Sequence, residues 1–170
     1  MAFSYDRDTA VAHLRSADPV LDRIIDAVGP FTMEPGDGIF RALGRAIFFQ
    51  QLAGPAARAI MNRVLATLGT DDQLWYTPQQ MLAATDEELR AAGLSRQKLT
   101  YLRDLAEKFA SGELTENDFH HLDDEDVIQK ASSVKGIGRW TAEMLLIFTL
   151  DRPDVLPVDD LGVRRGMQIS

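Results

Sequence analysis

Two glycines separated by one residue precede a helical segment near the C-terminal end of the chain, and a pair of aspartates opens the next helical segment. The glycines are Gly136 and Gly138, and we expect the first helix to begin at Arg139. The aspartates end a proline-containing loop over residues 153–160. Helix starts this close together predict short helices joined by tight turns.

Helix-capping residues and apolar stripes predict the same architecture along the rest of the chain. No alternating run of β-branched residues is long enough to require a strand. We therefore expect one all-α domain over residues 1–170, built of two helical lobes with a cleft between them. The expected helices cover about residues 19–28, 39–51, 54–68, 96–109 and 139–150, with further helix starts near residues 78, 86, 124 and 160.

Composition restricts the class of protein. A length of 170 residues is enough for one domain with a real core, and no apolar run is long enough to cross a membrane. The N-terminus carries no targeting signal, so we expect a cytoplasmic protein, associated with the nucleoid if it is bacterial. The absence of cysteine excludes disulfides, iron–sulfur clusters and cysteine-bound zinc.

The net charge of −8 argues against a nonspecific polybasic DNA binder. It does not exclude DNA, because backbone amides and a small basic patch suffice for a few phosphates. Basic residues do gather around the glycine motif: Lys130, Lys135, Arg139, Arg164 and Arg165.

The glycine motif predicts an anion site. Gly136 and Gly138 permit a tight turn with exposed N–H groups, and the positive end of the following helix points the same way. A DNA phosphate fits such a site. Taken alone, such glycines more often mark an ordinary interhelical turn.

The aspartate pair also has two interpretations. Asp159 or Asp160 is a good N-cap for the last helix. A fixed carboxylate can instead stabilise the positive charge that develops on a sugar during cleavage of an N-glycosidic bond, and can orient the attacking water. A metal site is disfavoured, because no other ligand lies at suitable spacing.

Residues 136–144 and 152–163 together resemble the helix-hairpin-helix DNA glycosylases, and within them the 3-methyladenine DNA glycosylase II branch. Residues 45–52 and 93–102 are similar to two further segments of that branch. The resemblance covers about residues 35–166, with four motifs in the expected order. It implies the helix-hairpin-helix glycosylase fold and a target nucleotide everted into a cleft.

The resemblance also implies roles for individual residues. Asp160 falls at the catalytic position, and the hairpin at residues 134–138 at the phosphate clamp. The turn at Gln51 and Leu52 falls at the wedge that fills the gap left by the everted base. The resemblance thus implies DNA contacts at Gln51, Leu52, Gly136, Ile137, Gly138, Arg139 and Thr141.

Trp140 replaces the lysine that forms a Schiff base in family members that also cut the backbone, so the resemblance implies a monofunctional enzyme that uses water. An aromatic face also suits an electron-poor alkylated base. We therefore expect Trp140, Met144 and Phe48 to line the base pocket. For Trp140, an aromatic anchor in the core is the alternative.

No cofactor is expected, although relatives hold a monovalent cation (Na⁺ or K⁺) on hairpin carbonyls. The corresponding carbonyls here belong to Ser132, Val134 and Ile137. Only ten residues follow Asp160, which leads us to expect that the C-terminal part is truncated relative to family members.

The leading hypothesis is a monomeric monofunctional glycosylase of base excision repair. It would release alkylated purines of the 3-methyladenine and 7-methylguanine type from double-stranded DNA. A non-catalytic binder of damaged or abasic DNA is the second hypothesis, and an acidic helical interaction module is the third.

Overall fold

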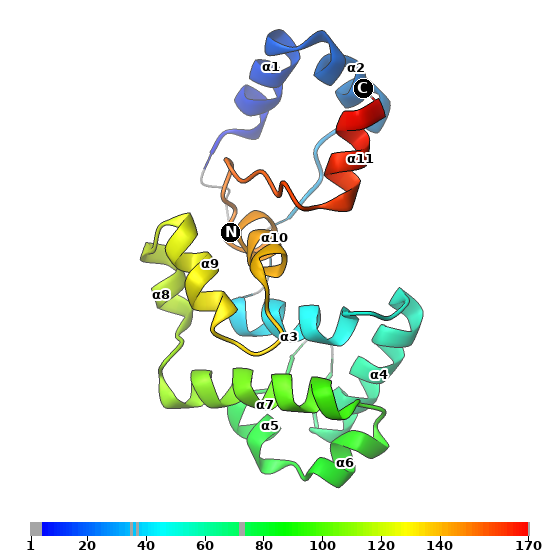
Figure 1. Cartoon of the computed structure of the whole chain (residues 1–170), viewed down its shortest axis with the longest axis vertical. Coiled ribbons are helices and arrows are strands. Elements are labelled where there is room, and N and C mark those ends of the chain that lie inside the picture. Colours follow the sequence, from blue (N-terminus) through cyan, green and yellow to red (C-terminus); the bar gives the residue numbers. More distant parts are fainter. Residues whose placement is uncertain (1–4, 35, 37, 72–73, 170) are drawn as a thin grey trace.

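The computed structural model describes residues 5–34, 36, 38–71 and 74–169, and within them it contains helices and no strand (Figure 1). This confirms the expected all-α class. Within that part, every helix is too short or too polar to span a bilayer. The helices are α1 (Arg7–Ala17), α2 (Pro19–Val28), α3 (Ile39–Phe49), α4 (Gly54–Thr67), α5 (Pro78–Ala83), α6 (Asp86–Ala91), α7 (Arg96–Ser111), α8 (Glu116–His121), α9 (Asp124–Ser132), α10 (Arg139–Phe148) and α11 (Leu161–Ile169).

Helix α3 is central to the packing. It contacts α4, α7, α8 and α10, while α5 and α6 pack on α7, and α9 packs on α10. Its inner face is fully buried at Ile39, Leu43 and Ile47. The buried apolar residues of the core belong to the segment from α3 to α10, whereas α1 and α2 contribute none. In Figure 1, α1, α2 and α11 lie above this core, and α10 lies between the two groups.

Charged side chains from other helices cap both ends of α3. The Glu116 carboxylate accepts hydrogen bonds from the backbone N–H groups of Ile39 (2.7 Å) and Phe40 (3.0 Å). At the other end, the Lys98 ammonium donates to the Phe48 carbonyl at 2.5 Å. A negative group at the N-terminus and a positive group at the C-terminus both match the helix dipole. The ends of α3 are therefore held by α8 and α7.

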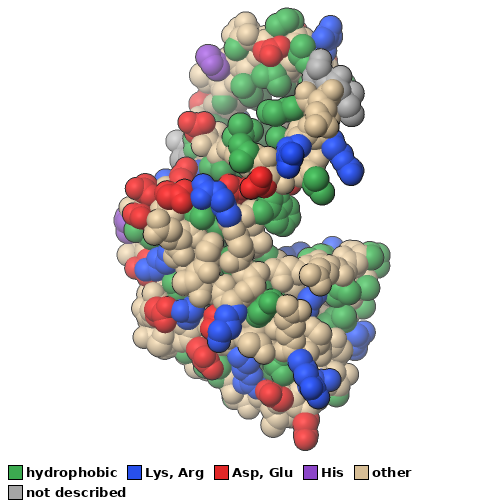
Figure 2. Space-filling model, in the orientation of Figure 1, with side chains coloured by type: hydrophobic (Ala, Val, Ile, Leu, Met, Phe, Trp, Pro, Cys, Tyr) green, Lys and Arg blue, Asp and Glu red, His purple; other side chains and the backbone are tan. Residues whose placement is uncertain are grey.

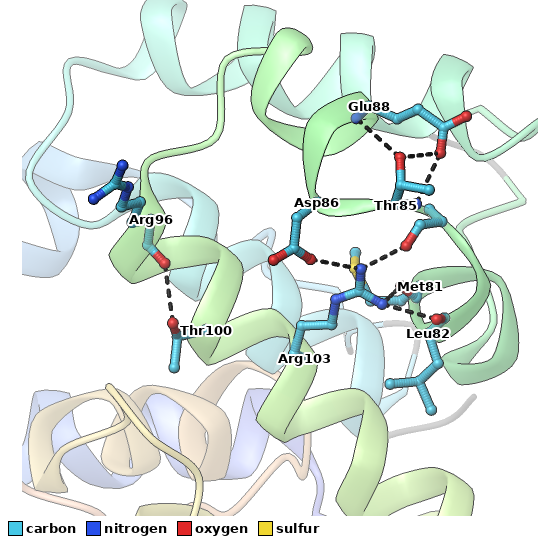
Figure 3. Close-up of polar contacts among 9 residues, drawn as sticks. Met81, Leu82, Thr85, Asp86, Glu88, Arg96, Thr100 and Arg103 are labelled. Atoms are coloured by element: carbon cyan, nitrogen blue, oxygen red, sulfur yellow. Dashed lines mark hydrogen bonds and ion pairs between the residues drawn. The ribbon is translucent and has the colours of Figure 1, made fainter.

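Capping boxes at Thr77 and Thr85 begin α5 and α6 at the expected starts, and a third at Thr115 begins α8. Arg103 of α7 has a structural role. Figure 3 shows its guanidinium donating to the carbonyls of Met81 (2.7 Å) and Leu82 (2.9 Å), at the end of α5. It also donates to the Ala84 carbonyl and pairs with Asp86. These contacts attach α5 and α6 to α7.

Candidate active site

A cleft of about 710 Å³ separates the C-terminal half of α3 from α10. The first turns of α7 and the glycine hairpin complete its wall. In Figure 2 the surface is hollowed on the right, between the upper helices and the region of α3 and α4. The lining residues are Ala42, Leu43, Ala46, Phe49, Gln50, Gln51, Gln97, Lys98, Tyr101, Gly136, Trp140, Thr141, Met144, Leu145, Phe148 and Thr149.

Asp160 lies at the start of α11 and is hydrogen-bonded to the wall of this cleft. Its Oδ1 accepts the backbone N–H of Val163 at 2.9 Å, which is N-cap geometry. Its Oδ2 accepts the indole N–H of Trp140 at 2.8 Å. The Asp160 backbone N–H donates to the Pro157 carbonyl at 3.0 Å, which fixes the end of the loop. The Asp160 side chain therefore caps α11 and also binds a residue of the cleft wall.

These contacts set the charge of the carboxyl group. The hydrogen bond from the Val163 backbone and then the one from the Trp140 indole lower the pKa of Asp160 below its ordinary value of 3.8, and desolvation acts in the opposite direction. Asp160 is consequently an anion at neutral pH. A preorganised anion is the state that stabilises developing positive charge without first losing a proton.

Trp140 lines the cleft and is half exposed, with 49% of its surface accessible. This excludes the alternative of a core anchor. Thr141 and Met144 follow it on the same wall. Trp140 therefore lines the cleft and also donates its indole N–H to Asp160.

Phe48 is a wrong prediction for the pocket. Its side chain is 1% exposed and packs edge-on against Trp75, with ring centroids 6.1 Å apart. The neighbouring Phe49 lines the cleft instead, opposite Phe148 of α10. Successive residues on a helix point about 100° apart, so one of two adjacent phenylalanines faces the core and the other the cleft.

The two hairpin glycines have different environments. Gly136 has φ of 83°, and a Cβ added there would lie 2.2 Å from the Tyr101 ring. The fold itself therefore requires glycine at this position. Gly138 is the N-cap of α10, has no capping side chain, and would place a Cβ in open space. Glycine is among the residues that helix N-caps accept, and the space around position 138 would admit a side chain.

The other hairpin residues are also fixed. The Ile137 side chain is buried, and its backbone N–H donates to the Val134 carbonyl at 3.0 Å. Arg139 binds both Glu125 oxygens, at 3.0 and 2.9 Å, and Glu143 at 3.1 Å. The predicted DNA contact of Arg139 would therefore require exchange of carboxylate partners.

The turn between α3 and α4 contains the predicted wedge. Gln51 has φ of 55°, a left-handed conformation that is uncommon for glutamine. Its side chain is exposed and lines the cleft, and Leu52 is 39% exposed. Strained backbone of this kind is common where a side chain must be presented in one direction. The wedge role of these two exposed residues stays a prediction.

The predicted cation site uses main-chain oxygens. Ser132 is the last residue of α9, and Val134 and Ile137 belong to the hairpin. Neutral carbonyl oxygens are suitable donors for Na⁺ or K⁺. Among the described residues, no group of three His, Cys, Asp or Glu side chains could hold a metal ion. The carbonyl site stays a prediction.

Comparison with known proteins places this geometry in a family. The family model described as HhH-GPD superfamily base excision DNA repair protein matches residues 45–169. The chain belongs to this superfamily. The match includes the predicted wedge turn, the hairpin, Trp140 and Asp160, and it covers the residues that line the cleft except Ala42 and Leu43.

Individual proteins and solved structures are similar to this chain over most of its length. A protein named DNA-3-methyladenine glycosylase 1, from Schizosaccharomyces pombe, is 38% identical over 162 residues, which cover 92% of this chain and 70% of the relative. The structure of a 3-methyladenine DNA glycosylase from the same yeast, in complex with abasic DNA, has a TM-score of 0.80 at 35% identity, covering 94% of this chain and 79% of that one. A DNA-3-methyladenine glycosidase from Bacillus halodurans gives 0.83 at 34% identity, with coverages of 98% and 75%.

Replacing Trp140 with Phe should raise the pKa of Asp160. In the unchanged protein the hydrogen bond from the indole lowers the pKa of Asp160. The substitution removes this donor and leaves the Val163 bond in place. Loss of a donor to the ionised form disfavours that form, so the pKa moves up toward 3.8. A carbon NMR titration of the labelled Asp160 carboxyl measures the change. The matched control is Phe148→Leu, another exposed aromatic of α10, which should leave the titration unchanged. An unchanged pKa in Trp140→Phe would contradict the assigned bond.

Proposed function

We propose that this protein is a monofunctional DNA glycosylase that hydrolyses the N-glycosidic bond of alkylated purines in double-stranded DNA during base excision repair. The observation that carries the proposal is the Asp160 carboxylate, ionised and fixed by Val163 and Trp140 beside an aromatic-lined cleft. The names of the relatives at 38% and 31% identity, DNA-3-methyladenine glycosylase 1 and alkylbase DNA glycosidase-like protein, support the same reaction and substrate class.

The chemistry follows from the groups present. An alkylated purine such as 3-methyladenine or 7-methylguanine leaves as an activated base, so departure needs little proton donation. Positive charge then develops on the deoxyribose, and the Asp160 anion stabilises it. The same carboxylate orients the water that attacks the sugar. No protonated acid is required of Asp160, which agrees with its lowered pKa.

The cleft provides the recognition of the base. Its walls carry Trp140, Phe49, Phe148 and Met144, which present mostly apolar and aromatic surface. A ring that carries a positive charge or is electron-poor binds favourably to aromatic faces. Trp140 has no amine to attack the sugar, so water remains the nucleophile and a strand-cutting step through position 140 is excluded.

DNA contacts are proposed at two elements. The N–H groups at the Gly138 start of α10 would bind a backbone phosphate, helped by the helix dipole. Gln51, with Leu52 beside it, would enter the space that the everted base leaves. A cation held by the carbonyls of Ser132, Val134 and Ile137 would add positive charge next to the same phosphate. A monomeric state and a cytoplasmic location stay predictions.

The direct experiment is base release by the purified chain. Incubation with methylated duplex DNA, followed by chromatography and mass spectrometry of the free bases, should show 3-methyladenine and 7-methylguanine and no strand nicking before alkali treatment. Binding to abasic-site DNA without any base release would overturn the proposal and favour the non-catalytic binder. Absence of both activities would favour the interaction module.

Replacing Gly138 with Asp should separate folding from DNA binding. Aspartate is a better N-cap than glycine, and its Cβ meets open space, so the free energy of unfolding should stay the same or rise by up to about 1 kcal/mol. The same carboxylate repels a phosphate at the α10 start, so affinity for abasic-site DNA should fall roughly tenfold or more. Fluorescence anisotropy and thermal denaturation measure the two effects.

The control is Thr77→Asp, which makes the same charge change at the N-cap of α5, away from the cleft. It should leave DNA affinity within about twofold. Equal losses in the two variants would show that net charge, and not the hairpin, governs binding.

A further inference from the structure

The wedge turn and the hairpin are joined directly. The side-chain amide of Gln50 donates to the Gly136 carbonyl at 2.7 Å, across 86 residues of sequence. Gln50 precedes Gln51, the residue with left-handed backbone. Gly136 belongs to the turn that leads into α10. One hydrogen bond therefore connects the residue next to the predicted wedge with the predicted phosphate clamp.

The first turns of α7 contact both of the segments that this bond joins. The Tyr101 ring packs against Gly136 so closely that no Cβ fits, and the Gln97 amide donates to the Tyr101 hydroxyl at 2.7 Å. Lys98 donates to the Phe48 carbonyl just before the turn. The hairpin and the wedge turn thus rest on one helix, and Gln50 closes the connection between them.

Alternative roles for Gln50 fit less well. Its amide is already bonded to a backbone carbonyl, which leaves it less available for DNA than the exposed Gln51 side chain. The bond is exposed and connects two surface elements, so its loss should cost the folded state little. A bond that stabilises little, yet joins two elements that must meet the same DNA, suits a coupling role.

We propose that Gln50 is a positioning residue that couples phosphate binding at the hairpin to wedge insertion at the Gln51 turn. The inference rests on the proposed glycosylase function. With the bond in place, a hairpin that has bound its phosphate holds the turn in the position from which the wedge enters the duplex. Without the bond, each element binds independently, and correct hairpin contact no longer favours base eversion.

A double-mutant cycle tests this coupling. The variants are Gln50→Met, which keeps the length of the side chain and removes the donor, Gly138→Asp, and the combination. Two quantities are measured: the single-turnover rate of base release from methylated duplex DNA, and the affinity for abasic-site DNA. Thermal denaturation checks that Gln50→Met remains folded. The control cycle pairs Gln50→Met with Thr77→Asp.

Coupling predicts non-additive effects. Gln50→Met alone should lower the single-turnover rate roughly fivefold, the magnitude of one hydrogen bond. Gly138→Asp should then cost at least threefold less in the Gln50→Met background than in the unchanged protein. The control cycle should be additive. Additive effects in the test cycle would overturn the inference. Additivity is also the result expected if Gln50 contacts DNA independently of the hairpin.

The outcomes also separate this inference from the proposed function. If the unchanged protein releases no base but binds abasic DNA, the glycosylase proposal fails, and the affinities alone still decide the coupling. If it binds no DNA, both fail. If it releases bases and the cycle is additive in both quantities, only the coupling fails.

Discussion

The two oxygens of one carboxylate are held by different elements, and the arrangement of the candidate active site depends on this. Asp160 caps α11 with Oδ1 and accepts the Trp140 indole with Oδ2. The first bond fixes the carboxylate to its own helix, and the second fixes it to the wall of the cleft. Both keep it ionised. A structural N-cap thus serves as a preorganised anion, so the capping and catalytic interpretations of Asp160 do not compete.

The opposite wall of the cleft depends on α3, a short helix that other helices fix at both ends. Glu116 binds its first amides, and Lys98 binds a carbonyl of its last turn. With its ends held, α3 presents Phe49 to the cleft and ends in the Gln51 turn at a defined position. The wedge turn, the hairpin and Trp140 then surround one cleft, although nearly 90 residues separate Gln51 from Trp140.

Local chemistry made much of this predictable. The expected starts of nine described helices lie within one residue of the observed starts, and the five expected ends lie within two residues of the observed ends. Caps and turns could be predicted because they depend on neighbours in the sequence. Helix α8 was missed since its capping box uses Asp118 in place of Glu or Gln, and α1 offers only a weak apolar stripe. The motifs around Gly138 and Asp160 identified the candidate site. Three features could not be predicted, because each depends on the packing of helices that are distant in sequence. They are which of Phe48 and Phe49 points into the core, the Gln50–Gly136 hydrogen bond, and the contact of Lys98 with the Phe48 carbonyl.

The central claim is that the charge of Asp160 drives base release while other groups bind the DNA. Asp160→Asn tests it most directly, because the amide keeps the size of the side chain and one oxygen for the α11 cap. We predict that release of 3-methyladenine from methylated duplex DNA falls at least a hundredfold, with affinity for abasic-site DNA changed by less than about threefold. Base release by Asp160→Asn at the rate of the unchanged protein would contradict the account.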